Sequence, residues 1–117
     1  MKNKSSQTQL VTNILASKWA IRVVYTLSSG TKRYGELRKS IDGITEKALT
    51  DTLKHLERHG LLKRKYHASI PPKVEYKLTV DGFDLIEIMD SMALWGDRHS
   101  DKIRRAQNAY DHEKDVS

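Results

Sequence analysis

The clearest hydrophobic pattern in the chain lies between residues 43 and 60. Its apolar positions recur at helical spacing: Leu49, Leu53 and Leu56. The spacing predicts a helix over about residues 45–59, with Thr45 as the N-cap and Gly60 just after the last turn. The opposite face is polar. It is either an ordinary solvated surface or a face that reads base edges in the major groove of DNA.

Helical spacing also predicts three earlier helices, over about residues 8–16, 19–28 and 35–40. Residues 1–7 are polar and without periodicity, so we expect a disordered tail there. The third and fourth helices are short and are separated by a glycine-bearing turn at Asp42-Gly43. This arrangement is the helix-turn-helix pattern, although small helical bundles also contain such pairs.

After Gly60 the period of the apolar positions changes to two. Residues 62–66 and 73–78 are therefore predicted to be strands, and residues 32–34 are long enough only for a minor strand or a linker. The prolines Pro71-Pro72 belong in the connecting loop, because proline cannot donate to a strand ladder. A hairpin that follows a helix-turn-helix is a wing. The expected fold is therefore mainly α with a small antiparallel β wing, a winged helix-turn-helix.

A long helix is predicted from Val80, capped by Thr79, to at least Trp95, with an interruption at Gly96. It carries two apolar rows: Phe83, Ile86, Met89 and Ala93, and beside them Leu85, Ile88, Met92 and Trp95. A helix on one small core needs a single row, so the surplus indicates a second copy of the chain. Deeper burial of the helix in its own domain is the alternative.

The expected domain organisation follows from these elements. We expect a winged helix domain with dimerisation helices over 8–96, after the tail at 1–7. Residues 97–117 are strongly polar, and we expect them to form a frayed helical extension to about Tyr110, followed by a disordered tail.

The positive charge is concentrated in the middle of the chain. The 117 residues have a net charge of +6: residues 1–30 carry four basic and no acidic side chains, residues 31–77 twelve basic and six acidic, and residues 78–117 five basic and nine acidic. Such a basic region usually attracts nucleic acid. A membrane is a weaker alternative, because the chain has neither a basic amphipathic helix nor a run of about 18 apolar residues.

The sequence contains no recognisable catalytic set. The absence of cysteine excludes disulfides, thiolate nucleophiles and zinc–cysteine sites. No phosphate-binding loop or nucleophile elbow occurs, so we expect neither an enzyme nor a cofactor. His55 and His59 have a spacing that can hold a metal, but no third ligand accompanies them, and two exposed histidines are the simpler interpretation. We therefore expect no metal. The absence of cysteine makes a reducing cytoplasm the default location, and the basic N-terminus has no apolar segment behind it that would make it a signal peptide.

Several short motifs together are typical of one family: Lys18-Trp19, Arg33-Tyr34-Gly35-Glu36-Leu37-Arg38, Gly43-Ile44-Thr45, Gly60-Leu61, residues 71–79, Gly82 and Trp95-Gly96. By these motifs the chain resembles the HxlR-type winged helix transcription regulators, relatives of the MarR-type regulators. The resemblance implies a homodimeric bacterial or archaeal DNA-binding regulator. The helix after Gly43 would enter the major groove, and the N- and C-terminal helices would form the dimer. The expected dimer interface comprises Leu10, Val11, Ile14, Leu85, Ile88, Met92 and Trp95.

The expected function is sequence-specific binding of double-stranded DNA by this dimer, with repression favoured over activation. The base-reading candidates are Thr45, Lys47, Thr50, Asp51 and Lys54. Asp51 would either accept from cytosine N4 or orient Lys47 or Lys54. The phosphate and wing candidates are Lys32, Arg33, Arg38, Lys39, Lys63, Arg64, Lys65 and Lys73. The hairpin over 62–78 would contact the backbone or minor groove.

Two questions stay open at this point. The basic face could instead serve a winged helix protein-interaction module that docks an acidic protein, and RNA binding is disfavoured because no aromatic platform is present. The signal is also unknown. Several relatives sense oxidants through a cysteine near the N-terminus, where this chain has Ser5-Ser6-Gln7. A small-molecule effector near Trp19, Met92 and Trp95 is one option; the alternative is that these residues only build core and interface.

Overall fold

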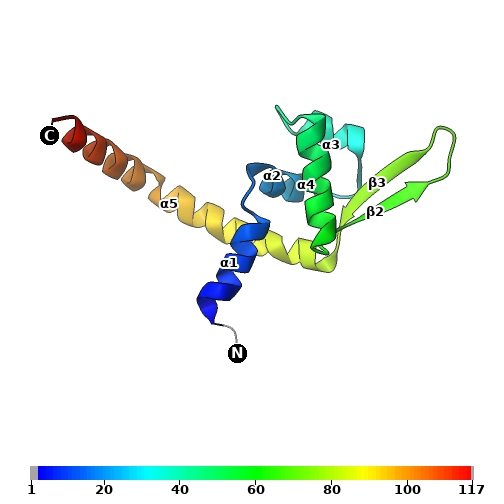
Figure 1. Ribbon diagram of the computed structural model, residues 1–117, viewed down its shortest axis with the longest axis horizontal. Coiled ribbons are helices and arrows are strands. Elements are labelled where there is room, and N and C mark those ends of the chain that lie inside the picture. Colours follow the sequence, from blue (N-terminus) through cyan, green and yellow to red (C-terminus); the bar gives the residue numbers. More distant parts are fainter. Residues whose placement is uncertain (1–2, 117) are drawn as a thin grey trace. The chain divides into compact units, whose positions relative to one another are not determined.

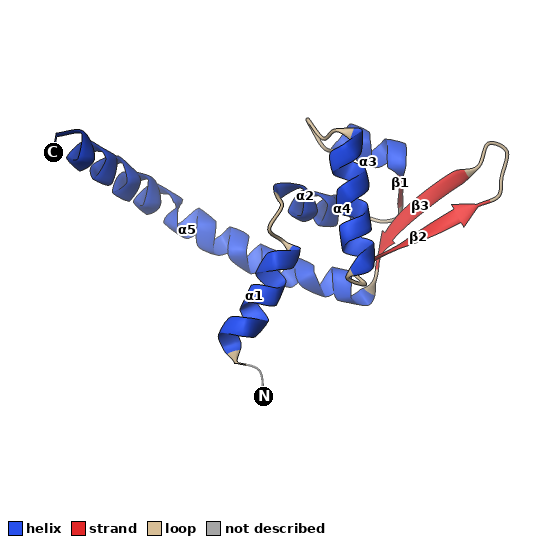
Figure 2. Cartoon of the chain, viewed as in Figure 1, coloured by secondary structure: helices blue, strands red, loops and turns tan. Residues whose placement is uncertain are grey.

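The computed structural model describes residues 3–116 of the chain (Figure 1). Within them, the elements in order are α1 (Lys4–Ile14), α2 (Lys18–Leu27), β1 (Lys32–Arg33), α3 (Tyr34–Ser40), α4 (Glu46–Arg58), β2 (Leu62–His67), β3 (Lys73–Leu78) and α5 (Val80–Val116). The chain divides into two units, residues 1–86 and 87–117. The first unit contains every element up to the start of α5, and the second consists of the rest of that helix. The winged helix-turn-helix, mainly α with a small antiparallel sheet, is confirmed (Figure 2).

Helix α1 begins earlier than predicted. The side chain of Asn3 accepts a hydrogen bond of 2.8 Å from the backbone N–H of Ser6, which satisfies one of the free donors of the first turn. Residues 4–7 are therefore helical, and the prediction of disorder was wrong for them. Residues 1–2 of the expected tail lie outside the described residues.

Helices α2, α3 and α4 bury apolar side chains in one core. The Ser17 side chain caps α2 by accepting from the N–H of Trp19 at 3.1 Å. Helix α3 is held at its start by Glu36, whose carboxylate accepts from the N–H of Arg33 at 2.9 Å. The turn to α4 has Gly43 at a φ of 78°, a backbone conformation that glycine adopts without strain. The buried apolar residues of these helices and the α3–α4 turn are Ala20, Val23, Val24, Leu27, Leu37, Ile41, Ile44, Leu49, Leu53 and Leu56.

Helix α4 ends in a Schellman motif. The N–H of Leu61 bonds to the carbonyl of Leu56 at 3.0 Å, and the N–H of Gly60 bonds to Glu57 at 3.0 Å. Gly60 has a φ of 74°, as the position after the last helical turn requires. Leu56 and Leu61, the two positions whose apolar side chains accompany this motif, are both buried.

The sheet has the strand order β1-β3-β2, and all its pairs are antiparallel. Figure 1 shows the β2–β3 hairpin projecting from the C-terminal end of α4. Leu62 pairs with Leu78 at the base of the hairpin, and both side chains are buried. Of the two alternatives expected at residues 32–34, a minor strand or a linker, the structure has the strand: β1, whose Lys32 pairs with Tyr76.

The hairpin joins α5 through a close main-chain contact. The Thr79 hydroxyl donates to the carbonyl of Gly60 at 2.7 Å and accepts from the N–H of Gly82 at 3.1 Å. The N–H of Thr79 bonds to the carbonyl of Leu61 at 3.0 Å. A Cβ at Gly82 would lie 2.1 Å from that same carbonyl oxygen, so only glycine fits there.

Helix α5 is continuous over its 37 residues. The predicted interruption at Gly96 was wrong, because this glycine continues the helix and has no unusual φ. The helix also passes Tyr110, where the frayed end was expected, and reaches Val116. None of the described helices combines the length and the apolar character that crossing a membrane requires.

Candidate nucleic-acid interface

The outer face of α4 carries the predicted base-reading residues. Lys47, Asp51 and Lys54 are exposed, and Thr50 is half-buried. The ammonium of Lys47 lies 2.8 Å from a carboxylate oxygen of Asp51, one helical turn further on. This hydrogen bond, with the attraction between the two charges, lowers the pKa of Asp51 and raises that of Lys47. Asp51 thus has a cationic partner on its own helix.

The N-terminus of α4 is fixed by side chains. The hydroxyl oxygen of Thr45 accepts from the N–H of Ala48 at 3.0 Å, so Thr45 is the cap that the sequence predicts. Its hydroxyl hydrogen is not used in that bond, and the residue is exposed. The guanidinium of Arg38 lies 3.3 Å from the carboxylate of Glu46, which links α3 to the first turn of α4.

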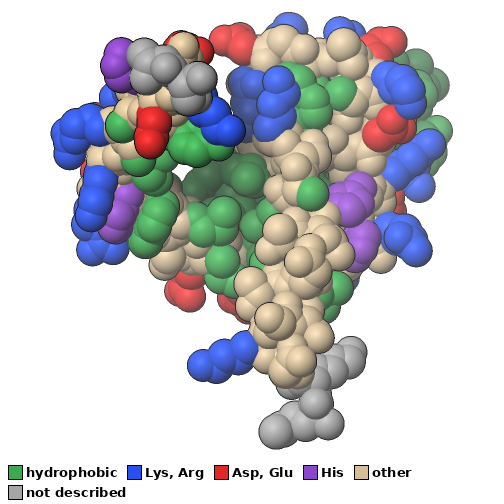
Figure 3. Space-filling view, turned by 60° about the vertical axis from the view of Figure 1, so that its left-hand side comes forward, with side chains coloured by type: hydrophobic (Ala, Val, Ile, Leu, Met, Phe, Trp, Pro, Cys, Tyr) green, Lys and Arg blue, Asp and Glu red, His purple; other side chains and the backbone are tan. Residues whose placement is uncertain are grey.

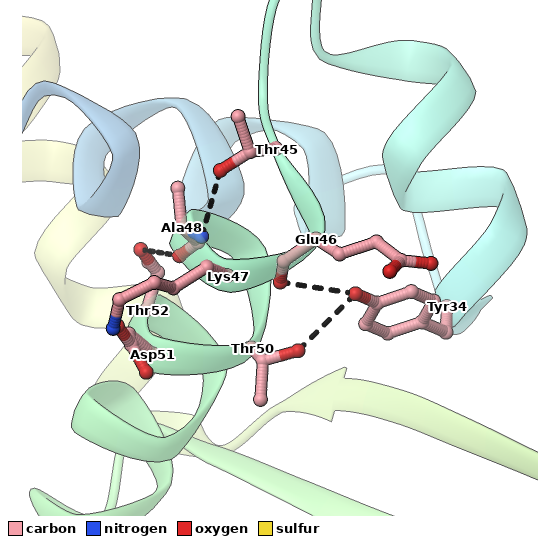
Figure 4. Close-up of polar contacts among 8 residues, drawn as sticks. All are labelled: Tyr34, Thr45, Glu46, Lys47, Ala48, Thr50, Asp51 and Thr52. Atoms are coloured by element: carbon pink, nitrogen blue, oxygen red, sulfur yellow. Dashed lines mark hydrogen bonds and ion pairs between the residues drawn. The ribbon is translucent and has the colours of Figure 1, made fainter.

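Tyr34 makes a further link between α3 and α4, one that the candidate residues did not include. Its hydroxyl lies 3.1 Å from the carbonyl oxygen of Glu46 and 3.2 Å from the hydroxyl oxygen of Thr50 (Figure 4). The sequence offered no signal for this contact, because it depends on how α3 crosses α4. The hydroxyl of Thr50 thus faces α3.

The basic wing residues fall on two faces of the sheet. Arg64 pairs with Tyr76, and its guanidinium lies 3.8 Å from the carboxylate of Glu57 on α4. Lys63 and Lys65 alternate with Arg64 and lie on the opposite face. The sequence prediction had placed these three residues in one group, but the period of two divides them.

Lys77, which was not among the candidates, is paired with Lys63 across the hairpin and lies on the same face. Arg33 and Lys73 also share that face by register. Its acidic residue, Glu75, contacts the imidazole of His67. Of the remaining phosphate candidates, Lys39 is exposed on α3, and Lys32 is half-buried on β1.

A small cavity of about 100 Å³ lies between α4 and the hairpin. It is lined by Thr50, Leu53, Lys54, Glu57, Arg64 and Tyr76. Burial raises the pKa of the Tyr76 hydroxyl, so this residue presents a neutral phenol to the cavity. The lining of the cavity thus combines Leu53 and the Tyr76 ring with three charged side chains.

A second cavity, of about 430 Å³, lies beside Trp19. Its lining comes from the α1–α2 region and from α4: Asn13, Ala16, Ser17, Trp19, Ala20, Ala48, Asp51, Thr52 and His55. Of the three residues named for an effector pocket, this cavity includes Trp19 and neither Met92 nor Trp95. The hydroxyl of Thr52 donates to the carbonyl of Ala48 at 2.7 Å.

The paired histidines of α4 bond to the backbone. A ring nitrogen of His55 lies 3.0 Å from the carbonyl oxygen of Ile14, and one of His59 lies 2.8 Å from that of His55. Across residues 3–116, no group of three or more histidine and carboxylate side chains is placed to hold a metal ion.

The predicted dimer residues differ in exposure. Leu10, Ile88, Met92 and Trp95 are 45–53% exposed. Part of the exposed apolar surface is visible in green in Figure 3. Val11 and Ile14 are half-buried, and Leu85 is buried at 7%, so Leu85 belongs to the protomer itself and not to a free surface.

Comparison with known proteins identifies the family of this chain. The HxlR-like helix-turn-helix family matches residues 14–104. The uncharacterized HTH-type transcriptional regulators YdeP and YkvN of Bacillus subtilis are 38% and 37% identical to the chain over 97 and 102 residues. These alignments cover 83% of the chain and 76% of YdeP, and 87% of the chain and 86% of YkvN.

Solved structures show the same fold. A MarR-family transcriptional regulator from Enterococcus faecalis V583 superimposes with a TM-score of 0.80 at 36% identity, over 90% of this chain and 96% of that one. The reduced form of the redox regulator HypR gives a TM-score of 0.75 at 33% identity, over 84% and 97%. The chain therefore belongs to the HxlR-like helix-turn-helix family of transcriptional regulators.

Proposed function

We propose that this regulator binds specific sites in double-stranded DNA as a homodimer and acts as a repressor in the cytoplasm. Helix α4 would lie in the major groove, and the β2–β3 hairpin would contact the backbone or minor groove. The observation that carries the proposal is the outer face of α4. This face is polar and exposed, and α4 is fixed by caps at both ends within the most basic region of the chain.

Lys47 and Lys54 are the candidates for reading guanine, whose O6 and N7 atoms accept from lysine. Asp51 supports this reading indirectly. Its carboxylate already accepts a hydrogen bond from Lys47, which favours a role in orienting that lysine over accepting from cytosine N4. The unused hydroxyl hydrogen of Thr45 suits a phosphate oxygen at the start of the helix.

The surrounding basic residues would contact phosphates and set the register of α4 without reading sequence. On α3 these are Arg38 and Lys39, and on the sheet they are Lys32, Arg33, Lys63, Arg64, Lys65 and Lys73. The register adds Lys77, which shares a face with Lys63.

The homodimer is supported by apolar side chains that remain exposed on α1 and α5: Leu10, Ile88, Met92 and Trp95. Two copies of α4 related by a two-fold axis would enter successive major grooves. The half-sites would then be spaced about 34 Å apart, one turn of DNA, or a multiple of that distance.

The test begins with the DNA sequence itself. DNA fragments that co-purify with the protein are sequenced, and binding to the enriched site and to random DNA is measured at two salt concentrations. We expect Lys47→Ala and Lys54→Ala to weaken discrimination at particular base pairs by ~1–3 kcal/mol. Lys39→Ala is the matched control. It should weaken binding to all sequences alike and reduce the salt dependence.

If Lys47→Ala lowered the affinity for the enriched site and for random DNA equally, the proposal that α4 lies in the major groove would be refuted. A protein-interaction module would give no enriched site at all, only weak retention that disappears with salt.

A further inference from the structure

Thr50 differs from the other residues on the outer face of α4. Lys47, Asp51 and Lys54 are exposed, whereas Thr50 is half-buried, and its hydroxyl contacts another helix. The contact is with Tyr34, the first residue of α3, whose hydroxyl oxygen lies 3.2 Å from that of Thr50. The same tyrosine hydroxyl lies 3.1 Å from the carbonyl oxygen of Glu46, one turn before Thr50 on α4.

The hydrogen atoms in this group can be assigned by counting donors. A carbonyl oxygen only accepts, so the single hydrogen of the Tyr34 hydroxyl is donated to Glu46. The bond between Tyr34 and Thr50 then requires the hydrogen of the Thr50 hydroxyl. In this arrangement Thr50 has no hydrogen left to donate to the acceptor atoms of a guanine, an adenine or a thymine.

The direction of the hydroxyl also fixes the rest of the side chain. Threonine is branched at Cβ, so a hydroxyl held toward Tyr34 leaves one direction for the γ-methyl group. Figure 4 shows the methyl of Thr50 pointing away from Tyr34. Thr50 also borders the cavity of about 100 Å³ between α4 and the hairpin, together with Leu53 and Tyr76.

We propose that Tyr34 determines part of the DNA specificity by holding Thr50 so that its methyl group, and not its hydroxyl, faces the DNA. The base recognised in this way is thymine, whose C5-methyl group is the apolar feature of the major groove. Tyr34 is a positioning residue, because it acts through Thr50. The inference rests on the proposed function, since it needs α4 to lie in the major groove.

The experiment replaces thymines by deoxyuridine, which removes only the C5-methyl group. Each thymine in one half-site of the enriched DNA is replaced in turn, and the dissociation constant is measured. We expect one position at which the wild-type protein loses about fourfold in affinity, the equivalent of one buried methyl group. Thr50→Ser should abolish the loss at that position, whereas Thr50→Val, which keeps a methyl group, should retain it.

Tyr34→Phe tests the positioning role directly. Without the tyrosine hydroxyl, Thr50 is free to change rotamer. The ratio of the affinity for DNA with thymine at that position to the affinity for DNA with deoxyuridine there should therefore fall toward one. The salt dependence should stay unchanged, because no charge is altered. The double variant Tyr34→Phe/Thr50→Val should recover the ratio, since valine presents a methyl group in either orientation. A merely structural role of Tyr34 would lower affinity for both DNAs equally.

The possible outcomes separate the inference from the proposed function. If specific DNA binding is present but no thymine position is sensitive, or if Tyr34→Phe leaves the ratio at its wild-type value, the inference is overturned. If no DNA sequence is preferred by the wild-type protein, the proposed function itself fails. A thermal unfolding curve for each variant shows that the protein measured is folded.

Discussion

Substitution of Gly82 by alanine should destabilise the protein strongly, although alanine is the better helix former. Gly82 lies in the first turn of α5, against the main chain that follows α4. A Cβ at this position would lie 2.1 Å from the carbonyl oxygen of Leu61 and 3.1 Å from a methyl carbon of Leu78. The first distance is far below the C···O contact distance of about 3.3 Å, and the nearest atom belongs to the backbone, so no side-chain rotation relieves it.

The size of the destabilisation follows from the contacts that α5 would lose by moving away from Leu61. Moving α5 away from Leu61 by roughly 1 Å would restore an ordinary contact distance. That shift would break the bond from the Thr79 N–H to Leu61, now 3.0 Å, and the bond from the Thr79 hydroxyl to Gly60, now 2.7 Å. Each such bond contributes about 1 kcal/mol, and overpacking adds about 1–3 kcal/mol. The helix propensity of alanine offsets about 1 kcal/mol, so we expect a net loss of about 2–4 kcal/mol.

Gly96→Ala is the matched control in the same helix. A Cβ at Gly96 would have no atom within 4 Å, and its φ is not positive, so the propensity of alanine acts alone. We expect a gain of about 0.5–1 kcal/mol. The assay is thermal unfolding at one fixed protein concentration, because association with a second copy shifts Tm. With about 4 °C per kcal/mol, Gly82→Ala should lower Tm by roughly 8–16 °C and Gly96→Ala should raise it slightly. A Gly82→Ala protein as stable as the wild type would refute the close approach of α5 to Leu61.

Three further predictions address the α5 junction, the proposed dimer and the charge pair on α4. Thr79→Val should lower the unfolding free energy by about 1–2 kcal/mol in urea titration, because both hydrogen bonds of the hydroxyl are lost. Met92→Glu should give a monomer in sedimentation velocity. Leu94 is equally exposed but lies about 200° further round the helix, so Leu94→Glu should leave the proposed dimer intact. The reverse result would contradict the predicted interface. Because the pKa of Asp51 is lowered, its pair with Lys47 stabilises the fold above about pH 4 and is lost as the pH falls through the lowered value. Asp51→Asn should therefore reduce the acid dependence of unfolding in this range, and an unchanged pH profile would show that the pair does not persist in solution.

The features that sequence predicted correctly are those determined by neighbours along the chain. The stripe Leu49, Leu53 and Leu56, the cap at Thr45 and the glycine at position 60 define α4 locally, and all are where they were expected. The change of period after Gly60 likewise defined the hairpin, whose observed strands match the predicted ones within one residue.

The features that sequence missed have two physical causes. Some depend on a single side chain that a reading of composition does not consider. Residues 4–7 are polar, which favours disorder, but Asn3 caps the first turn and α1 begins at Lys4. Others depend on contacts between distant elements. Tyr34 reaches Thr50 across sixteen positions, and the cavity beside Trp19 requires α1, α2 and α4 together. The separation of Arg64 from Lys63 and Lys65 was available from the period of two, but their common charge concealed it.

The contacts of α4 also determine whether its proposed DNA-reading face can be altered without a loss of stability. Its N-terminus is held by the Thr45 cap, and the loop after its C-terminus by the Schellman motif and the Thr79 hydroxyl. These bonds all involve main-chain atoms of the helix or the loop beyond it, and none uses Lys47 or Lys54. Substitutions of these two lysines should therefore change stability by no more than about 0.5 kcal/mol, as for ordinary surface positions. A helix fixed in the free protein also needs little ordering on binding, so under the proposed function a change in specificity after Lys54→Ala reports the lost base contact, whereas Lys47→Ala also frees the Asp51 carboxylate.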